Sequence, residues 1–303
     1  NEEENVDKFY KEIKNTIGKI GISFELIFCL DPSDDNTEKI IKDICLKDES
    51  VSLIKMSRKF GQAACTIAGI ENSVGNYCIV IDADFQDPVD LIPDLYSKIK
   101  TNDYDVINAK RNKREGLNNF YKIFSSIGYK ILNSFSDVKI PENVGDFRIF
   151  NRKIANHIIS LTESHNFLRG LISFVGFKQG EISFTRPERK LGKTKYSTIF
   201  GSLKIAFNGF IGYSNFFLTL LFYVGIALLI IAIIIFLVIS YDVLISETKA
   251  YPIGVPSIIF AVIFLGAINI ISVGILGLYI ARIYDEVRSR PKYIVDEKIN
   301  IKK

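Results

Sequence analysis

The sequence predicts an α/β protein with a mostly parallel sheet, followed by two C-terminal transmembrane helices. Strand-like and helix-like segments alternate from residue 6 to residue 109, which is typical of a parallel sheet covered by helices on both faces. The apolar run 77–81 ends in three carboxylates and Pro88, as expected of a central strand that delivers acids to its C-terminal edge. The uncharged apolar stretches 216–240 and 253–281 are each long enough to cross a hydrocarbon core of about 30 Å.

The elements before the membrane can be placed from apolar periodicity and from capping and turn residues. We expect Gly145-Asp146-Phe147-Arg148 to lead into a further helix. The other expected elements are, in order, a helix over 6–17, a strand over 24–30, a helix from 36 to about 45, a strand near 51–54, a helix near 62–73, the strand 77–81, a helix over 89–99, and strands over 105–109 and 181–185.

The apolar stretches and their flanking charges divide the chain into five parts. Basic residues flank the outer ends of the two stretches, whereas the segment between them carries Lys249 against Asp242 and Glu247. The positive-inside rule therefore predicts cytoplasmic termini. The expected parts are a cytoplasmic domain over 1–197, an amphipathic juxtamembrane segment over 198–215, transmembrane helices over 216–240 and 253–281, and a cytoplasmic basic tail over 282–303.

Composition narrows the partners and the kind of site. The net charge of +4 is small and the basic excess lies beside the apolar stretches, which favours anionic lipid and argues against nucleic acid. The four cysteines lie in apolar surroundings without the close spacing of a zinc site, so we expect reduced core residues. The chain has two histidines, which excludes a histidine-rich metal site.

Asp82 and Asp84 are the first candidate site residues. They are two positions apart, so in extended chain both side chains would face the same way. Paired carboxylates repel unless a cation lies between them, which indicates a divalent ion that carries phosphates. Asp-x-Asp also occurs in surface turns and helix caps, so the pair alone leaves both readings open.

Five motifs in order resemble the family-2 glycosyltransferases that act on polyprenyl phosphates, relatives of dolichyl-phosphate mannose synthase and of bacterial undecaprenyl-phosphate glucosyltransferases. Asn1–Asn5 resemble the end of the family's opening Pro-Val-Tyr-Asn-Glu-Glu motif, so we expect the first strand to lie upstream. The other motifs are Ser57–Gln62 (Ser-Arg-Asn-Phe-Gly in the family), Asp82–Pro88 (Asp-Ala-Asp-Leu-Gln-Asp-Pro), Gly145–Arg148 (Gly-Asp-Phe-Arg) and Arg189–Tyr196 (Arg-x-x-Gly-x-Ser-Lys-Tyr, with Thr for Ser).

The resemblance implies a GT-A, Rossmann-like catalytic domain over residues 1–197. Asp84 and Gln86 would hold Mg²⁺ or Mn²⁺ on the donor diphosphate, and Asp146 with Asp84 would be the catalytic carboxylates. The residues that would bind the nucleotide sugar are Asp31, Asp82, Asp84, Glu3 and Arg58. The family usually reads Val-Asp-Asp-Gly-Ser where this chain has Cys29-Leu30-Asp31-Pro32-Ser33, which leaves the preference for a nucleotide open.

The resemblance also implies the acceptor side. A lipid phosphate is already largely ionised at pH 7, so Asp146 is either a general base or a group that positions the acceptor or the metal. Arg148 is either a salt-bridge partner of Asp146 or an acceptor contact. The residues that would clamp the acceptor phosphate are Arg186, Arg189, Lys193, Lys195 and Arg148, with a solvated basic face as the alternative for the first four.

We therefore expect an inverting, metal-dependent hexosyltransferase that moves glucose from UDP-glucose to undecaprenyl or dolichyl phosphate on the cytoplasmic leaflet, most simply of a bacterial inner membrane. A processive polysaccharide synthase is an alternative, but such relatives carry a Gln-x-x-Arg-Trp motif and this chain has no Trp. A non-enzymatic subunit for lipid-linked sugar flipping explains the apolar helices but not the carboxylates. A homo-oligomer is compatible with the sequence.

Overall fold

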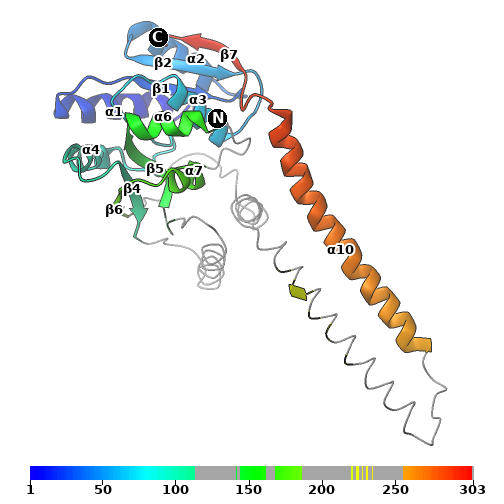
Figure 1. Cartoon of the computed structure of the whole chain (residues 1–303). Helices are drawn as coiled ribbons and strands as arrows, with labels where there is room; N and C mark the ends of the chain where they lie inside the picture. The colour runs from blue at the N-terminus through cyan, green and yellow to red at the C-terminus, as the bar shows by residue number, and fades with distance from the viewer. Residues whose placement is uncertain are drawn as a thin grey trace, which may run out of the picture. The chain divides into compact units, whose positions relative to one another are not determined.

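The computed structural model describes residues 1–112, 141, 144–161, 168–185 and 255–301, with isolated positions between 220 and 234 (Figure 1). The described residues divide into two compact units. Residues 1–185 and 290–301 belong to one unit, and residues 255–289 belong to the other.

The first unit contains two sheets of mixed direction. In one sheet, β1 (Leu26–Leu30) pairs in parallel with β2 (Val51–Met56), and β7 (Val295–Ile299) pairs antiparallel with the other edge of β2. The other sheet has the order β3-β5-β4-β6, with bounds Tyr77–Val80, Val144–Asn151, Val106–Arg111 and Gln179–Phe184.

The expectation of a mostly parallel sheet is wrong. β5 runs antiparallel to both β3 and β4, and the second sheet is parallel only between β4 and β6. The motif that carries Asp146 lies inside β5, so the expectation that this motif leads into a helix is also wrong. Phe147 and Ile149 enter one core and Phe150 enters another, so both faces of β5 are buried and the alternation typical of a strand is hidden.

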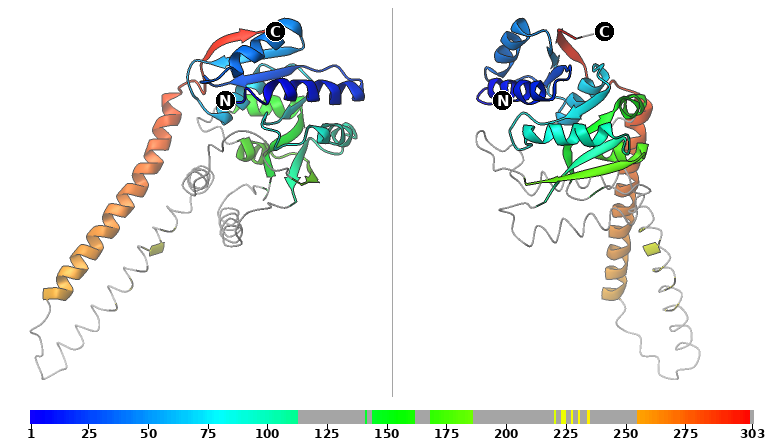
Figure 2. Two further views of the ribbon diagram at one scale, coloured as in Figure 1. Left: turned by 180° about the vertical axis from the view of Figure 1, so that it is seen from behind. Right: turned by 90° about the vertical axis from the view of Figure 1, so that its left-hand side faces the viewer.

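Helices cover the sheets on two sides (Figure 2). One core is shared by α1 (Val6–Ile20), α2 (Thr37–Lys47) and α4 (Ile92–Lys100), which follows the short helix η1 (Val89–Leu91). A second core is shared by α3 (Gln62–Glu71), α6 (Arg152–Ser160) and α7 (Leu168–Val175). Cys45, Cys65 and Cys78 are buried, and all four cysteines are free thiols, as expected.

The second unit contains α10 (Val255–Arg288), which covers the second apolar stretch and continues past residue 281, where the sequence analysis ended it. Its part Ile268–Arg288 is long and apolar enough to cross a membrane, and it is the one such helix in the described part of the chain. The basic loop 186–196 and the juxtamembrane segment 198–215 lie outside the described residues, and so does the first apolar stretch except for the isolated positions named above.

The segment after α10, which the sequence analysis described as a basic tail, packs into the first unit. Ser52 donates to the Asn300 carbonyl at 2.8 Å, and Lys42 pairs with Glu297 of β7 at 2.6 Å. Tyr293 donates a hydrogen bond to Glu71 of α3. The C-terminal strand therefore ties α2, β2 and α3 together at one edge of the sheet.

Asn300 is the residue in this segment whose loss has the clearest expected cost. Its amide donates to the carbonyls of Cys45 (2.7 Å) and Val51 (3.1 Å), and its φ of 55° is tolerated better by Asn than by Ala. Asn300→Ala should lower the free energy of unfolding by about 2–3 kcal/mol, at about 1 kcal/mol for each hydrogen bond plus the backbone penalty.

Thermal melting of the full-length protein in detergent measures this effect. Asn102→Ala is the matched control, because Asn102 also has a positive φ, of 59°, but lies in an exposed turn after α4. If the two variants melt at the same temperature, the hydrogen bonds of Asn300 do not stabilise the fold.

Candidate active site

Three carboxylates lie in a tight turn after β3, which we call the acidic turn (Asp82–Asp87). β3 ends at Val80, so Asp82 and Asp84 lie after the strand, and the argument from the spacing of extended chain does not apply to them. Phe85 has a φ of 59°, and its ring packs edge-on against Phe9 at 5.7 Å. The Asp84 carboxylate accepts from the Gln86 backbone N–H at 3.0 Å. Packing of Phe85 therefore holds a strained turn that presents the acids.

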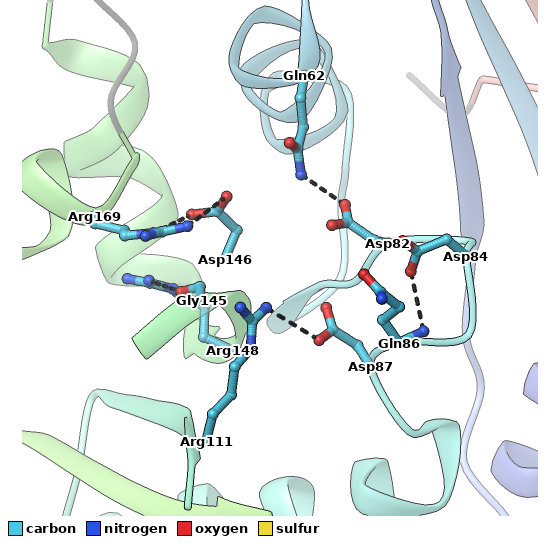
Figure 3. A network of polar contacts seen from close by, with 10 residues as sticks. All are labelled: Gln62, Asp82, Asp84, Gln86, Asp87, Arg111, Gly145, Asp146, Arg148 and Arg169. Atoms are coloured by element: carbon cyan, nitrogen blue, oxygen red, sulfur yellow. Dashed lines mark hydrogen bonds and ion pairs between the residues drawn. The ribbon is translucent and has the colours of Figure 1, made fainter. Parts of the chain in front are cut away.

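The pairing of β3 with β5 brings the acidic turn to Asp146. Val80 and Arg148 are the last pair of this ladder, and Asp82 lies just beyond it, close enough to Asp146 for the two charges to interact. Gln62, at the start of α3, donates to Asp82 at 2.7 Å (Figure 3). Burial, followed by the nearby charges of Asp87, Asp84 and Asp146, raises the pKa of Asp82 to about 7. Negative charge is thus concentrated between α3, the acidic turn and the start of β5.

Asp146 is paired with an arginine that the sequence analysis did not select. Arg169 of α7 donates from Nε to Oδ1 of Asp146 at 3.0 Å and from Nη2 to Oδ2 at 3.5 Å. Burial acts to raise the pKa of Asp146, but the charge and hydrogen bond of Arg169 together with the charges of Arg148 and Arg111 outweigh it, so the pKa lies below the usual value. Asp146 is therefore ionised and held in a fixed direction.

Arg148 is buried in the sheet. It is 1% exposed, lies in register between Val80 and Asn108, and donates to the Gly145 carbonyl at 2.5 Å. Burial lowers its pKa to about 10, so the guanidinium remains charged at neutral pH. The partner that Asp146 contacts is Arg169 and not Arg148. A side chain so deeply enclosed is poorly placed to clamp a lipid phosphate, in contrast to what the resemblance implied.

A further arginine, Arg111 at the end of β4, connects two strand ends. One of its Nη atoms lies 3.5 Å from Oδ1 of Asp87, whose side chain is 2% exposed. The guanidinium also lies against Gly145, since a Cβ built on that glycine would be 2.6 Å from Arg111 Nη2. Figure 3 shows Arg111 between the acidic turn and the start of β5. Sequence alone offers a weak signal for it, a basic residue closing a strand.

Asp31 holds the loop before α3. Its two carboxylate oxygens accept from the backbone N–H groups of Phe60 (3.0 Å) and Gly61 (2.8 Å). Gly61 has a φ of 94°, which permits this close turn into α3. The Arg58 guanidinium lies 3.9 Å from the centre of the Phe60 ring. Asp31, just after β1, therefore holds the loop between β2 and α3 that carries Arg58 and leads to Gln62 and hence to Asp82.

Glu3 lies elsewhere, at the start of α2. Its carboxylate accepts from both the backbone N–H and the side-chain amide of Asn36, each at 3.0 Å. This is a capping interaction that the backbone at a helix start requires. Of the remaining predicted site residues, Arg186, Arg189, Lys193 and Lys195 lie outside the described residues.

The oxygen donors of the acidic turn suit a hard divalent ion that is shared with a ligand. Over the residues that the structure describes, no group of three or more His, Cys, Asp or Glu side chains forms a self-contained metal site. Mg²⁺, however, is commonly bound by one or two carboxylates together with substrate phosphates. Asp82, Asp84 and the Gln86 side chain, which extends back toward both carboxylates in Figure 3, can supply such a partial set.

Comparison with known proteins supports a transferase. A family model described as "Glycosyl transferase family 2" matches residues 1–159. The chain is 35% identical to "Uncharacterized glycosyltransferase YkcC" of Bacillus subtilis, over 99% of this chain and 92% of that protein. It is 34% identical to the "SfII prophage-derived bactoprenol glucosyl transferase" of Shigella flexneri, over 97% of this chain and 94% of that protein.

Among solved structures, the crystal structure of S. aureus TarS 1-349 in complex with UDP-GlcNAc matches with a TM-score of 0.42 and 16% identity, over 70% of this chain and 65% of that chain. This likeness is too distant to bear on function. The family match spans the acidic turn and Asp146, and the curated relatives match over nearly the full length. The chain therefore belongs to glycosyl transferase family 2 and has that family's GT-A fold, here with mixed sheets.

Proposed function

We propose that this glycosyltransferase moves glucose from UDP-glucose to a polyprenyl phosphate at the cytoplasmic face of a membrane, with inversion at the anomeric carbon. The observation that carries the proposal is the acidic turn placed opposite Asp146 at one edge of the sheet. The name of the Shigella flexneri relative, a bactoprenol glucosyl transferase, supports the choice of sugar and acceptor.

On the donor side, the acidic turn would bind the diphosphate through a divalent cation. Mg²⁺ or Mn²⁺ held by Asp84 and Gln86 would neutralise the charge that develops on the leaving nucleoside diphosphate. Burial, followed by the charges of the neighbouring carboxylates, raises the pKa of Asp82, and a cation between the acids would offset that repulsion. Arg58 lies on the loop that leads to Gln62, and Asp31 holds that loop through hydrogen bonds, so both would border the nucleoside.

Asp146 would position the acceptor or the cation rather than act as a general base. Its pKa is lowered and both its oxygens are engaged by Arg169, so it is a weak proton acceptor at neutral pH. A phosphate acceptor does not need one, because its oxygen is already largely ionised. Direct attack of that oxygen on the anomeric carbon gives inversion without a covalent enzyme intermediate.

On the acceptor side, we propose that the lipid phosphate binds near the basic loop 186–196 and that the protein is anchored in a membrane. Most of the large apolar side chains of α10 whose exposure the structure describes are exposed, among them Ile270 (75%) and Val273 (66%). Such a helix would bury these side chains in lipid. Basic charge at the outer flanks of the apolar stretches supports a cytoplasmic catalytic unit.

A transfer assay tests the function. Membranes that contain the protein are offered a panel of labelled sugar nucleotides, and lipid-linked product is extracted and identified. We expect a glucosyl phospholipid from UDP-glucose. Transfer from another sugar nucleotide would correct the donor, and a growing polysaccharide or the absence of any transfer would contradict the proposal.

The first prediction on this site concerns the cation. Asp84→Asn removes one negative charge from the acidic turn and keeps its size, so we expect turnover to fall by orders of magnitude while the melting temperature changes little. Asp90→Asn is a control, because Asp90 is an exposed carboxylate on the neighbouring helix η1. Full activity of Asp84→Asn, or full activity of the wild type in EDTA, would refute the role of the cation.

The second prediction concerns the acceptor. If Arg189 contacts the lipid phosphate, Arg189→Ala should weaken the apparent acceptor affinity or the turnover roughly tenfold to a hundredfold, as expected from the loss of about 1.5–3 kcal/mol, and should spare the donor. Kinetics with each substrate varied in turn measure this.

The control for Arg189→Ala is Arg290→Ala, which removes an exposed basic residue from another part of the chain. An exposed charge that makes no specific contact contributes about 0–1 kcal/mol. A defect of Arg189→Ala that is confined to the sugar nucleotide, or one no larger than that of the control, would place the acceptor site elsewhere.

A further inference from the structure

Arg111 joins the two parts of the site that must keep a fixed spacing. The acidic turn belongs to the connection after β3, and Asp146 belongs to β5. The last paired residues of β3 and β5 are Val80 and Arg148, so beyond them the backbone ladder no longer fixes the turn to β5. Arg111 pairs with Asp87 in that turn, and its guanidinium lies against Gly145, the residue before Asp146.

The fit around Gly145 is specific for glycine. A Cβ at this position would lie 2.6 Å from Nη2 and 3.0 Å from Cζ of Arg111, so any other residue would push the guanidinium away. On its other side, the Gly145 carbonyl accepts from Arg148. Gly145 is thus enclosed by two guanidinium groups, and Asp146 is held by a third, from Arg169. The backbone that carries Asp146 is fixed by these arginines.

The Arg111 side chain is enclosed, with 11% of its surface exposed, and Asp87 is 2% exposed. An ion pair in such surroundings is screened much less than an exposed one, and removal of one partner leaves a buried charge. The neighbouring pair Lys110–Glu181, at 2.7 Å, has side chains that are 39% and 40% exposed. Two adjacent residues of β4 therefore form one enclosed and one open ion pair.

We propose that Arg111 is a positioning residue, which acts through Asp87 and the surface of Gly145 to set the spacing between the acidic turn and Asp146. This proposal rests on the proposed function, because the proposed function assigns the acidic turn to the donor and Asp146 to the acceptor. When Arg111 is lost, the acidic turn moves away from β5, the divalent cation is held less firmly and transfer slows.

A double-mutant cycle with Arg111→Met and Asp87→Asn tests the assignment in the full-length protein. We expect each single variant to lower kcat tenfold to a hundredfold and to raise the Mg²⁺ concentration that gives half-maximal activity. The double variant should have a kcat no lower than that of the less active single variant, because both changes break the same ion pair. Arg111→Lys should recover part of the activity, and Lys110→Met should match the wild type in both quantities.

Two results would overturn the proposal. Effects that multiply in the double variant would mean that Arg111 and Asp87 act separately, with Arg111 contacting a substrate itself. An unchanged Mg²⁺ requirement in Arg111→Met would mean that the acidic turn is not displaced.

Hydrogen exchange of the same variants gives a readout that does not depend on transfer, so failure of the proposed function can be told apart from failure of this proposal. Arg111→Met should speed exchange in the peptides that contain residues 82–87 and 144–147, while the rest of the first unit and Lys110→Met remain as in the wild type. Gly145→Ala should produce the same local change by displacing the guanidinium. Exchange that is faster throughout the unit, or unchanged in these two segments, would contradict a positioning role.

Discussion

The site depends on holding several carboxylates close together at one edge of a sheet. Asp82, Asp84 and Asp87 follow β3, and the pairing of β3 with β5, which ends at Val80 and Arg148, brings Asp146 to the same edge. Burial, and then the repulsion from Asp87, Asp84 and Asp146, raises the pKa of Asp82. Arg111 and Arg169 compensate Asp87 and Asp146. The charge left at Asp82 and Asp84 suits a cation that arrives with a diphosphate.

The arginines also explain how one carboxylate can be electrostatically useful without serving as a base. Arg169 keeps Asp146 ionised and fixes the direction of its carboxylate. Arg148, a buried residue of the same strand, adds positive charge and donates a hydrogen bond to the Gly145 carbonyl. Transfer to a phosphate requires correct placement of two anionic substrates more than it requires removal of a proton. The proposed positioning role of Arg111 follows from the same requirement, because the acidic turn and Asp146 repel each other and their spacing has to be maintained.

Local signals predicted the acids and most helices, and long-range pairing accounts for what they missed. The carboxylates after the strand 77–81 and the buried cysteines were identifiable from residue types and spacing, whereas Asp146 was identified through the resemblance to the family. The direction of β5 was not, because strand reversal depends on pairing with β3 and β4, and a strand buried on both faces shows no alternation. Arg169 is 23 residues from Asp146 in the sequence, so their contact cannot be predicted from local spacing. β7 is short and rich in charge, and its pairing with β2 brings together residues more than 200 positions apart.

The central claim, that the acidic turn binds the donor through a divalent cation, is tested most directly by nucleotide binding. Calorimetric titration of the purified protein with UDP, with Mg²⁺ and then with EDTA, needs neither the lipid acceptor nor turnover. The account predicts that UDP binds at least tenfold more tightly with Mg²⁺, and that this difference disappears in Asp84→Asn. Equal affinity for UDP with and without Mg²⁺ in the wild type would contradict it.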